Sequence, residues 1–411
     1  MTSTTSFRSD TAAQRAARPG IGAGLLLVLA LLQAVTPFAT DLYLPAFPAM
    51  TADLSTSATG VQLTLTAFLV GIAAGQLVFG PLSDRYGRRT PLVVGAVIFV
   101  LSSAAAVVAP TVGVLIAARV VQGLSGAAGM VLGRAVISDL AVGPAAARAM
   151  SLMMIVGGVA PVVAPLIGGV IADPLGWRGV LAVVAVIALA SLVAVVFGVR
   201  ESLPRERRDA MRADKAREGS ALAPLATWGY LGYTLAFAFG FGVMMAYISA
   251  SPFIYQTMMG LGTLEYSLLF GVNALALMVV SAASAKLVDR VPAERLMGLG
   301  LGISAVGAAL FLLIAATGAP VWLLAVAVFV AVAPLGLVLG NGSALALAAV
   351  PRAAGSASAV LGAAQFGLAA VISPLVSVAG EDTAMPCAIV MVASAAAALA
   401  AYGVARRAGR A

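Results

Sequence analysis

Two charged side chains lie in long apolar stretches, where a charge is costly. Asp41 lies near the end of the first apolar run, and Arg119 lies within the fourth. A charge near the centre of a bilayer costs roughly 2.5–3.5 kcal/mol on insertion scales, so it persists only with a partner, with water or for a function. At 1.5 Å per residue, Arg119 is expected about 13 Å below the turn at Pro110, and Asp41 roughly 6–10 Å below the segment Pro45–Pro48. Both therefore belong to the same half of the membrane, and Asp41 is a candidate for reversible proton binding.

No other charged residue combines these properties. Of the 16 acidic residues only Asp41, and of the basic residues only Arg119, falls well inside an apolar run away from its arginine-rich end. The alternative for Asp41 is that it caps a helix end in interfacial water.

Catalytic and metal chemistry have few candidates in this chain. It has no histidine and a single cysteine, Cys387, which excludes an internal disulfide and a zinc site made of Cys and His. The intramembrane carboxylates do not cluster. We therefore expect no metal, no cofactor and no enzymatic activity.

The elements that position Asp41 and Arg119 are predicted to be membrane-spanning helices. Hydrophobic residues make up 62% of the 411-residue chain and charged residues 10%, too few charges for an ordinary globular surface. The apolar runs are about 20 residues long, as a hydrocarbon core of about 30 Å requires. They predict an all-α polytopic membrane protein with twelve transmembrane helices near residues 21–46, 59–82, 89–109, 111–137, 144–172, 177–199, 226–254, 263–287, 295–316, 320–347, 354–378 and 384–405.

Basic residues are distributed on one side of the predicted bilayer. Of the 24 lysines and arginines, all but Arg119 and Arg178 fall in the tails, in the even-numbered loops or at the helix ends beside them. The positive-inside rule then predicts a multi-pass protein of the cell membrane with both termini in the cytoplasm. The rule also accounts for the net charge of +8, so nucleic-acid binding is not indicated.

A charged segment divides the helices into two groups of six. The expected domains are a cytoplasmic tail at 1–20, a six-helix bundle at 21–199, a linker at 200–225, a second six-helix bundle at 226–405 and a tail at 406–411. A weak repeat supports this division, because Gly80-Pro-Leu-Ser-Asp84-Arg85 corresponds to Ala285-Lys-Leu-Val-Asp289-Arg290 in the second half. Parallel repeats around a midplane cavity are typical of transporters.

The loop after the second helix carries a longer motif, Gly80-Pro-Leu-Ser-Asp84-Arg85-Tyr-Gly87-Arg88-Arg89. It resembles the G-x-L-x-D-R-x-G-R-R loop of the major facilitator superfamily, whose fold is two pseudo-symmetric six-helix bundles. A turn with positive-inside arginines would explain Arg88 and Arg89 but not the spacing of the other residues. We expect Gly80 and Gly87 to permit close helix approach and a tight turn. Asp84 is expected at the N-terminus of the third helix, where the dipole favours an anion, and the resemblance implies a role in conformational gating.

Motifs in the first and fourth helices narrow the resemblance. The first ends in Thr36-Pro-Phe-Ala-Thr40-Asp41-Leu-Tyr43-Leu-Pro45-Ala-Phe-Pro48. This looks like the T-D-x-Y-L-P-x-x-P segment of twelve-helix drug:proton antiporters, especially the bicyclomycin and chloramphenicol/florfenicol resistance (Bcr/CflA) branch. The fourth contains Arg119-Val-Val-Gln122-Gly123-Leu-Ser-Gly126, similar to R-x-x-Q-G-x-G, whose arginine takes part in proton coupling. The resemblance implies that the fold brings Asp41 and Arg119 together as the coupling pair.

The fifth helix is rich in glycine and proline. Gly157, Pro161, Pro165 and Gly169 recur at every fourth position, with Gly158 and Gly168 beside them. Such a stripe lets another backbone approach closely. It resembles the antiporter motif G-P-x-x-G-G, which importers of the superfamily generally lack, although Ala replaces Gly before Pro165. Ordinary small-residue packing is the alternative.

Polar and aromatic residues within the helices are candidates for a substrate cavity. The alternatives to substrate binding are that the buried amides only form hydrogen bonds between helices and that the aromatic residues form a belt at the membrane interface. The candidates are Gln33, Phe38, Tyr43, Gln62, Gln122, Tyr247, Phe253, Asn273, Asn341 and Gln365.

The resemblance implies a monomer that exports amphiphilic antibiotics, such as phenicols or bicyclomycin-like compounds, in exchange for protons. One alternative is a transporter of an endogenous metabolite, such as a sugar, amino acid or peptide. Another is a non-transporting membrane sensor. The antiporter character of the fifth helix favours export over import.

Overall fold

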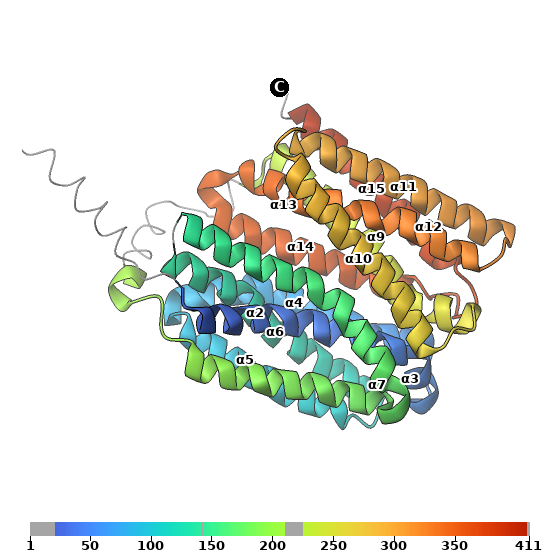
Figure 1. The fold of residues 1–411 in the computed structure, drawn as a ribbon, viewed down its shortest axis with the longest axis horizontal. Coiled ribbons are helices and arrows are strands. Elements are labelled where there is room, and N and C mark those ends of the chain that lie inside the picture. Colours follow the sequence, from blue (N-terminus) through green and yellow to red (C-terminus); the bar gives the residue numbers. More distant parts are fainter. Residues whose placement is uncertain (1–20, 142, 210–224, 409–411) are drawn as a thin grey trace, which may run out of the picture.

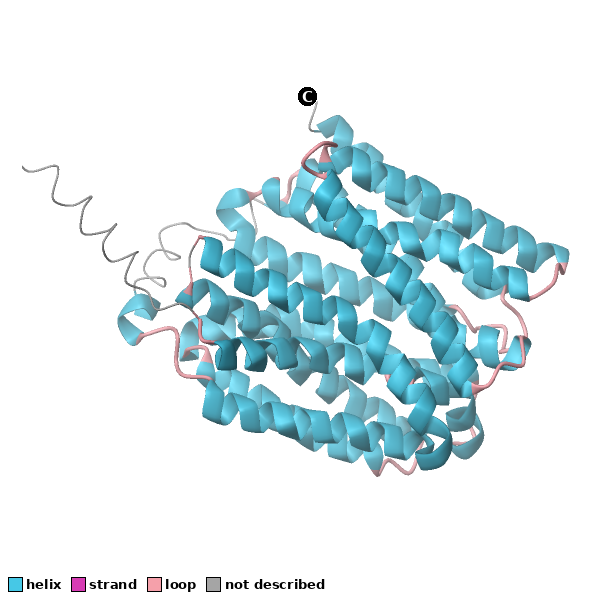
Figure 2. Cartoon of the chain, in the orientation of Figure 1, coloured by secondary structure: helices cyan, strands magenta, loops and turns pink. Residues whose placement is uncertain are grey.

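A computed structural model of the chain describes residues 21–141, 143–209 and 225–408. Within these ranges every regular element is a helix (Figure 2). The predicted tail at 1–20, residues 210–224 of the linker and residues 409–411 lie outside the described residues.

The first half of the chain folds into long antiparallel helices, and its longest helix reverses direction at a glycine. These helices are α2 (Ala23–Asp41), α3 (Phe47–Asp53), α4 (Ala58–Tyr86), α5 (Arg89–Val107), α6 (Val112–Leu140) and α7 (Pro144–Gly198). At 55 residues, α7 would be about 80 Å long if straight, far more than a bilayer core requires. Gly176 interrupts it with φ 64° and ψ 175°, a conformation open almost only to glycine. Figure 1 shows the chain turning back there, so the two arms of α7 are the predicted helices 144–172 and 177–199.

The second half adds six further crossings. They are formed by α9 (Trp228–Pro252) with a π-helical turn at Phe253–Met258, α10 (Thr263–Leu287), α11 (Ala293–Thr317), α12 (Trp322–Val332) with α13 (Gly336–Ala348), α14 (Ala354–Leu375) and α15 (Met385–Ala408). The bounds of α10 coincide with the prediction. A 3₁₀ turn at Ala333–Leu335 separates α12 from α13 because Pro334 lacks an N–H and cannot continue the helix. Eleven stretches are long and apolar enough to span a membrane, and dividing α7 at Gly176 makes twelve in the described chain.

The helices form two bundles that meet along a central interface (Figure 1). The N-terminal bundle contains α2 to α7, and the C-terminal bundle contains α9 to α15. Across the interface α4 packs against α14, and α7 packs against α10. These pairs define the walls between which a cavity can form.

The first helix ends earlier than predicted. The sequence predicted a helix to residue 46, but α2 ends at Asp41, and the chain continues through a 3₁₀ turn at Leu44–Ala46 into α3. Pro45 explains the break, because its ring would clash with the carbonyl of Asp41 four residues earlier and it cannot donate a hydrogen bond to that group. Asp41 is therefore the last residue of a helix that stops inside the protein, not a residue within a continuous helix.

Candidate substrate cavity and proton site

Arg119 on α6 is fully buried inside the N-terminal bundle. Its Nη2 donates to the backbone oxygen of Ala39 on α2 at 2.8 Å, and its Nη1 donates to Oε1 of Gln122 at 2.7 Å. The guanidinium carbon lies 4.6 Å from the ring centroid of Tyr43 and 4.3 Å from that of Phe68. Carbonyl oxygens and aromatic faces therefore surround this cation, which has donors in a fixed fork and no acceptor.

Asp41 and Arg119 are neighbours through the backbone and form no ion pair in this conformation. Among the described residues, no salt bridge within 4.0 Å joins them. Arg119 instead binds the carbonyl of Ala39, two residues before Asp41, so it holds the end of α2 that carries the acid. The direct contact implied by the sequence is thus replaced by a contact through the helix backbone. Asp41 itself is 5% exposed and faces a cavity between the two bundles.

This cavity has a volume of about 240 Å³, and its two walls differ in chemistry. The wall from the N-terminal bundle carries its polar groups on α2, namely Gln33, Thr36, Thr40 and Asp41. The wall from the C-terminal bundle is largely aromatic and thioether, with Phe241, Met244, Met245, Tyr247, Phe270 and Phe366. None of the described residues that line the cavity is basic.

The aromatic side chains of the C-terminal wall form two pairs. Tyr247 on α9 stacks on Phe270 of α10, with centroids 5.5 Å apart and an interplanar angle of 21°. Phe241 on α9 meets Phe366 of α14 edge to face at 5.7 Å. Such pairs are favourable beyond the area that they bury, and they hold rigid apolar surfaces in place.

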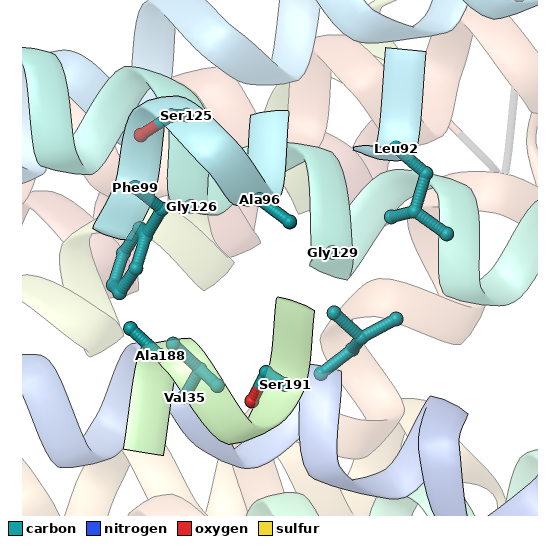
Figure 3. Close-up of a pocket in the computed structure, with 10 residues that line it drawn as sticks. Val35, Leu92, Ala96, Phe99, Ser125, Gly126, Gly129, Ala188 and Ser191 are labelled. Carbon is teal, nitrogen blue, oxygen red and sulfur yellow. The ribbon is translucent and has the colours of Figure 1, made fainter. Parts of the chain in front are cut away.

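A second, smaller pocket lies within the N-terminal bundle, between α2, α5, α6 and α7 (Figure 3). Its volume of about 20 Å³ leaves room for about one water molecule. The hydroxyls of Ser125 and Ser191 each donate to a carbonyl of their own helix at 2.8 Å. Because this pocket is small and its hydroxyls already have partners, the cavity between the bundles is the candidate substrate site.

The structure brings three of the predicted cavity residues to the cavity. Gln33, Tyr247 and Asn273 line it. Phe38, Tyr43, Gln62, Gln122, Phe253, Asn341 and Gln365 are not among its lining residues.

Three of these other candidates, Gln62, Gln122 and Asn341, are amides that connect helices instead. Gln122 lies between Arg119 and the hydroxyl of Ser103, to which it donates at 2.7 Å. Asn341 on α13 donates to Ser284 of α10 at 2.8 Å. Sequence reasoning missed Thr36 and the aromatic residues other than Tyr247, because apolar helices give no signal for which face turns inward.

Gln62 on α4 joins the two bundles at the end opposite the arginine-rich loop. Its Nε2 donates to the backbone oxygen of Ser249 at 2.9 Å and to Oγ of Ser377 at 2.7 Å. Thr59 donates to the backbone oxygen of Ser377 at 3.0 Å, and Gln256 donates to that of Pro45 at 3.0 Å. We call these four contacts the Gln62 seal, which closes this end of the interface.

The loop at residues 80–89 is organised around Arg88. The side chain of Arg88 binds Asp84 of α4 and Asp139 of α6, each at 2.9 Å. Burial opposes the charge of Arg88, but the two carboxylates outweigh it and raise the pKa of this guanidinium above its usual value. Gly87 has φ 90°, so the tight turn predicted there is confirmed.

Two expectations for this loop were wrong. A Cβ at Gly80 would meet no atom of another helix within 4 Å, so Gly80 supports no close helix approach in this conformation. Asp84 lies in the last turn of α4, and Glu201 occupies the N-terminus of α5 instead. The carboxylate of Glu201 accepts from the N–H groups of Arg88 and Arg89 at 2.8 and 3.2 Å. It therefore anchors the start of the linker to the arginine-rich loop.

The glycines of the first arm of α7 have different neighbours. A Cβ at Gly169 would lie 2.8 Å from Cβ of Ser267 and 2.9 Å from the backbone oxygen of Thr263 on α10. Gly168 faces the backbone of Leu42, and Gly157 faces Gln33. Gly158 has open space around it, so the helix contact expected there was wrong. The stripe is thus a real packing surface, but Gly158 is not part of it.

Two helical bundles that enclose a cavity between them define a multi-pass membrane transporter. The chain belongs to the major facilitator superfamily, whose pattern it matches over residues 29–374. It is 31% identical over 364 residues to a bicyclomycin resistance protein homolog of Haemophilus influenzae, covering 88% of this chain and 90% of that protein. It is 29% identical over 329 residues to a chloramphenicol resistance protein of Pseudomonas aeruginosa, covering 77% of each.

The fold is also that of solved transporters. The partially occluded inward-open xylose transporter of Escherichia coli superposes with a TM-score of 0.73 at 16% identity, covering 92% of this chain and 96% of that one. The resemblance to the superfamily and to its Bcr/CflA branch is therefore confirmed, as is the classification as a transporter rather than an enzyme.

Proposed function

We propose that this protein exports amphiphilic antibiotics in exchange for protons by alternating access. The observation that carries the proposal is the cavity between the bundles, where the buried carboxylate of Asp41 faces a wall of aromatic and thioether side chains. An apolar wall with few polar groups suits an amphiphile, and a titratable acid in the same cavity suits a proton that competes with it. Relatives named for bicyclomycin and chloramphenicol resistance support the same substrate class.

In this proposal Asp41 carries the proton and Arg119 positions it. Asp41 is open to the cavity and has no salt-bridge partner among the described residues. Arg119 holds the Ala39 carbonyl, so a movement of α6 relative to α2 changes the position of Asp41. Proton binding from one side and release to the other would then accompany the change of conformation.

The two ends of the interface act as alternating gates. The Gln62 seal closes one end, and the Arg88 cluster with Asp84, Asp139 and Glu201 lies at the other. By the positive-inside rule the Arg88 end is cytoplasmic, as are both termini. We expect Asp84→Asn to reduce transport without preventing membrane insertion, because it removes one of the two carboxylates that hold Arg88. If a well-expressed Asp84→Asn variant still shows wild-type efflux, the loop only helps to orient the protein in the membrane and has no gating role.

The experiment that tests the function has two parts. A susceptible host that expresses the protein is screened against a panel of antibiotics, with Asp41→Asn as the inactive control. Inverted, energised vesicles then report whether a protecting drug dissipates the pH gradient. Resistance together with drug-dependent proton release supports the proposal. If no antibiotic is transported, and a sugar, amino acid or peptide is, the endogenous-metabolite alternative replaces it.

A further inference from the structure

Three buried oxygen atoms of cavity-lining residues have no hydrogen-bond partner. They are Oε1 of Gln33 and Oγ1 of Thr36 on α2, and Oδ1 of Asn273 on α10. The Thr36 and Asn273 side chains are each 4% exposed. Leaving a buried polar atom unpaired is unfavourable, and most such atoms in native proteins have partners. Three of them at one cavity, from both bundles, point to groups that a ligand supplies.

The orientation of the Asn273 amide is fixed by its own contacts. Its Nδ2 donates to the backbone oxygen of Leu269 at 3.1 Å and to the hydroxyl of Tyr247 at 3.2 Å. A carbonyl oxygen only accepts, so the NH₂ group must face Leu269 and the amide cannot be reversed without losing this bond. The free group of Asn273 is therefore an acceptor, and no donor among the described residues forms a hydrogen bond with it.

The opposite wall offers a second unpaired group at Thr36, a hydroxyl that can both donate and accept. The hydroxyl of its neighbour Thr40 donates to backbone oxygens one turn earlier at 3.2 and 3.1 Å, as threonine in a helix commonly does. Thr36 lacks such a contact, although it lies in the same helix. Beside it, the missing side chain of Gly157 leaves room for the Gln33 amide, whose Cγ lies 3.4 Å from the position of a Cβ there.

We propose that the cavity selects amphiphiles that carry two polar groups, a hydrogen-bond donor for Asn273 and a donor or acceptor for the Thr36–Gln33 side of α2. Hydroxyl, amide N–H and ammonium groups qualify as the donor, and the aromatic pairs hold the apolar body in place. Anionic amphiphiles without donors are rejected, since they leave the Asn273 oxygen unpaired and approach Asp41 with like charge. Because the two anchors belong to different bundles, one ligand bridges them. This inference rests on the proposed function and narrows its substrate class.

The test compares a probe that carries three hydrogen-bond donors with probes that carry one or none, on the purified full-length protein. Chloramphenicol has two hydroxyls and an amide N–H. Its dideoxy analogue, with both hydroxyls replaced by hydrogen, keeps the aromatic body and only the amide N–H, without added bulk. Tetraphenylphosphonium is an aromatic cation with no donor. Dissociation constants are measured for the wild type, Asn273→Leu, Thr36→Val and the double variant. Asn341→Leu serves as the matched control, since it removes a buried amide outside the cavity.

We expect the wild type to bind chloramphenicol about tenfold more tightly than the dideoxy analogue, as one or two neutral hydrogen bonds imply. Asn273→Leu and Thr36→Val should each reduce this preference about threefold, and the double variant should abolish it. Tetraphenylphosphonium binding should change less than twofold, and Asn341→Leu should keep the wild-type preference.

Several results would overturn the inference. Equal binding of chloramphenicol and its analogue to the wild type would do so, as would an unchanged preference in both single variants. If tetraphenylphosphonium binds and chloramphenicol does not, the donor requirement is wrong while amphiphile transport stands. If neither probe binds, the inference fails, while the proposed function is decided separately by the antibiotic panel. Thr36→Val keeps the test decisive if Asn273→Leu does not fold.

Discussion

The N-terminal bundle contributes Asp41 and the hydroxyl and amide groups of α2 to the cavity, whereas the C-terminal bundle contributes two aromatic pairs and two methionines. Behind the first wall lies Arg119, a fully buried cation held by backbone and amide oxygens. Behind the second lie neutral contacts such as that of Asn341 with Ser284. Among the described residues, the acid that lines the cavity belongs to one bundle and most of the apolar lining belongs to the other. Under the proposed function, coupling requires the two walls to face each other, and proton and drug would compete at the interface between the bundles.

The largest effect on this division between the two walls is expected when the acid is removed from the α2 wall. Asp41→Asn is expected to abolish proton-driven efflux, because an amide cannot carry the proton, while the aromatic wall still binds drug. Drug-induced dissipation of the pH gradient in inverted vesicles measures this. Asp382→Asn, at an exposed acid in the loop after α14, is the control and should behave as wild type. Active pumping by Asp41→Asn would show that proton coupling resides elsewhere.

Removing the support behind that wall should have the next largest effect. Arg119→Ala leaves the Ala39 carbonyl and the Gln122 amide oxygen without their donor, at a cost of about 1–3 kcal/mol for each buried group. We expect transport to be lost and the thermal midpoint of the purified protein to fall. Arg178→Ala removes an exposed pair with Asp53, worth about 0–1 kcal/mol, and a part-buried hydrogen bond to the Ala109 carbonyl, so it should lower the midpoint less than Arg119→Ala does. Equal midpoints for the two variants would contradict a structural role for Arg119.

The spacing between the walls can be tested at two neighbouring glycines. Gly169→Leu places a side chain against Ser267 and Thr263 of α10, and overpacking of this kind costs roughly 1–3 kcal/mol. Turnover should fall, because the two bundles can no longer approach as closely there. Gly158→Leu adds the same side chain where the structure has open space, and it should keep near-normal turnover. The reverse order of effects would mean that this arm of α7 is rotated from the position described.

The smallest effect is expected on the aromatic wall. Phe270→Leu removes the stacked pair with Tyr247 but keeps an apolar side chain, so affinity for tetraphenylphosphonium should fall about two- to tenfold. Proton release in response to saturating drug should persist. Phe197→Leu is the control, because Phe197 is 84% exposed on the outer surface of the N-terminal bundle. Unaltered affinity in Phe270→Leu would show that the C-terminal wall is not the apolar binding surface.

Helix positions followed well from the sequence, because the length of an apolar run is set by the membrane. The bounds of α10 and a break between residues 172 and 177 were predicted from the sequence alone, and the structure places that break at Gly176. The early end of α2 was also readable in principle, since Pro45 stands four residues after Asp41. What could not be read was which face of each helix turns inward. Asn273 and Asn341 are both asparagines in apolar helices, yet only the first reaches the cavity.

Contacts between distant segments were likewise beyond local reasoning. Glu201 reaches Arg88 across 113 positions, and nothing beside it in the sequence indicates that contact. Gln62 was predicted as a substrate contact, and its polar side chain in an apolar helix gave no way to distinguish a ligand from a partner bundle. Its partners Ser249 and Ser377 come from the other half of the chain. The sequence indicated which polar residues lie in the helices and how deep in the membrane they lie. The hydrogen-bond partner of each residue could be identified only from the fold.

The Gln62 seal has an electrical consequence. The contacts of Gln62, Thr59 and Gln256 across the interface are made by neutral amides, hydroxyls and backbone carbonyls. Breaking these four contacts therefore moves no formal charge through the membrane field and separates no ion pair that external salt could screen. Under the proposed function, membrane voltage acts through the proton on Asp41 and through any charge on the drug, and not through these contacts. A neutral drug and a cationic drug should consequently differ in the voltage dependence of their export, although both pass the same uncharged contacts.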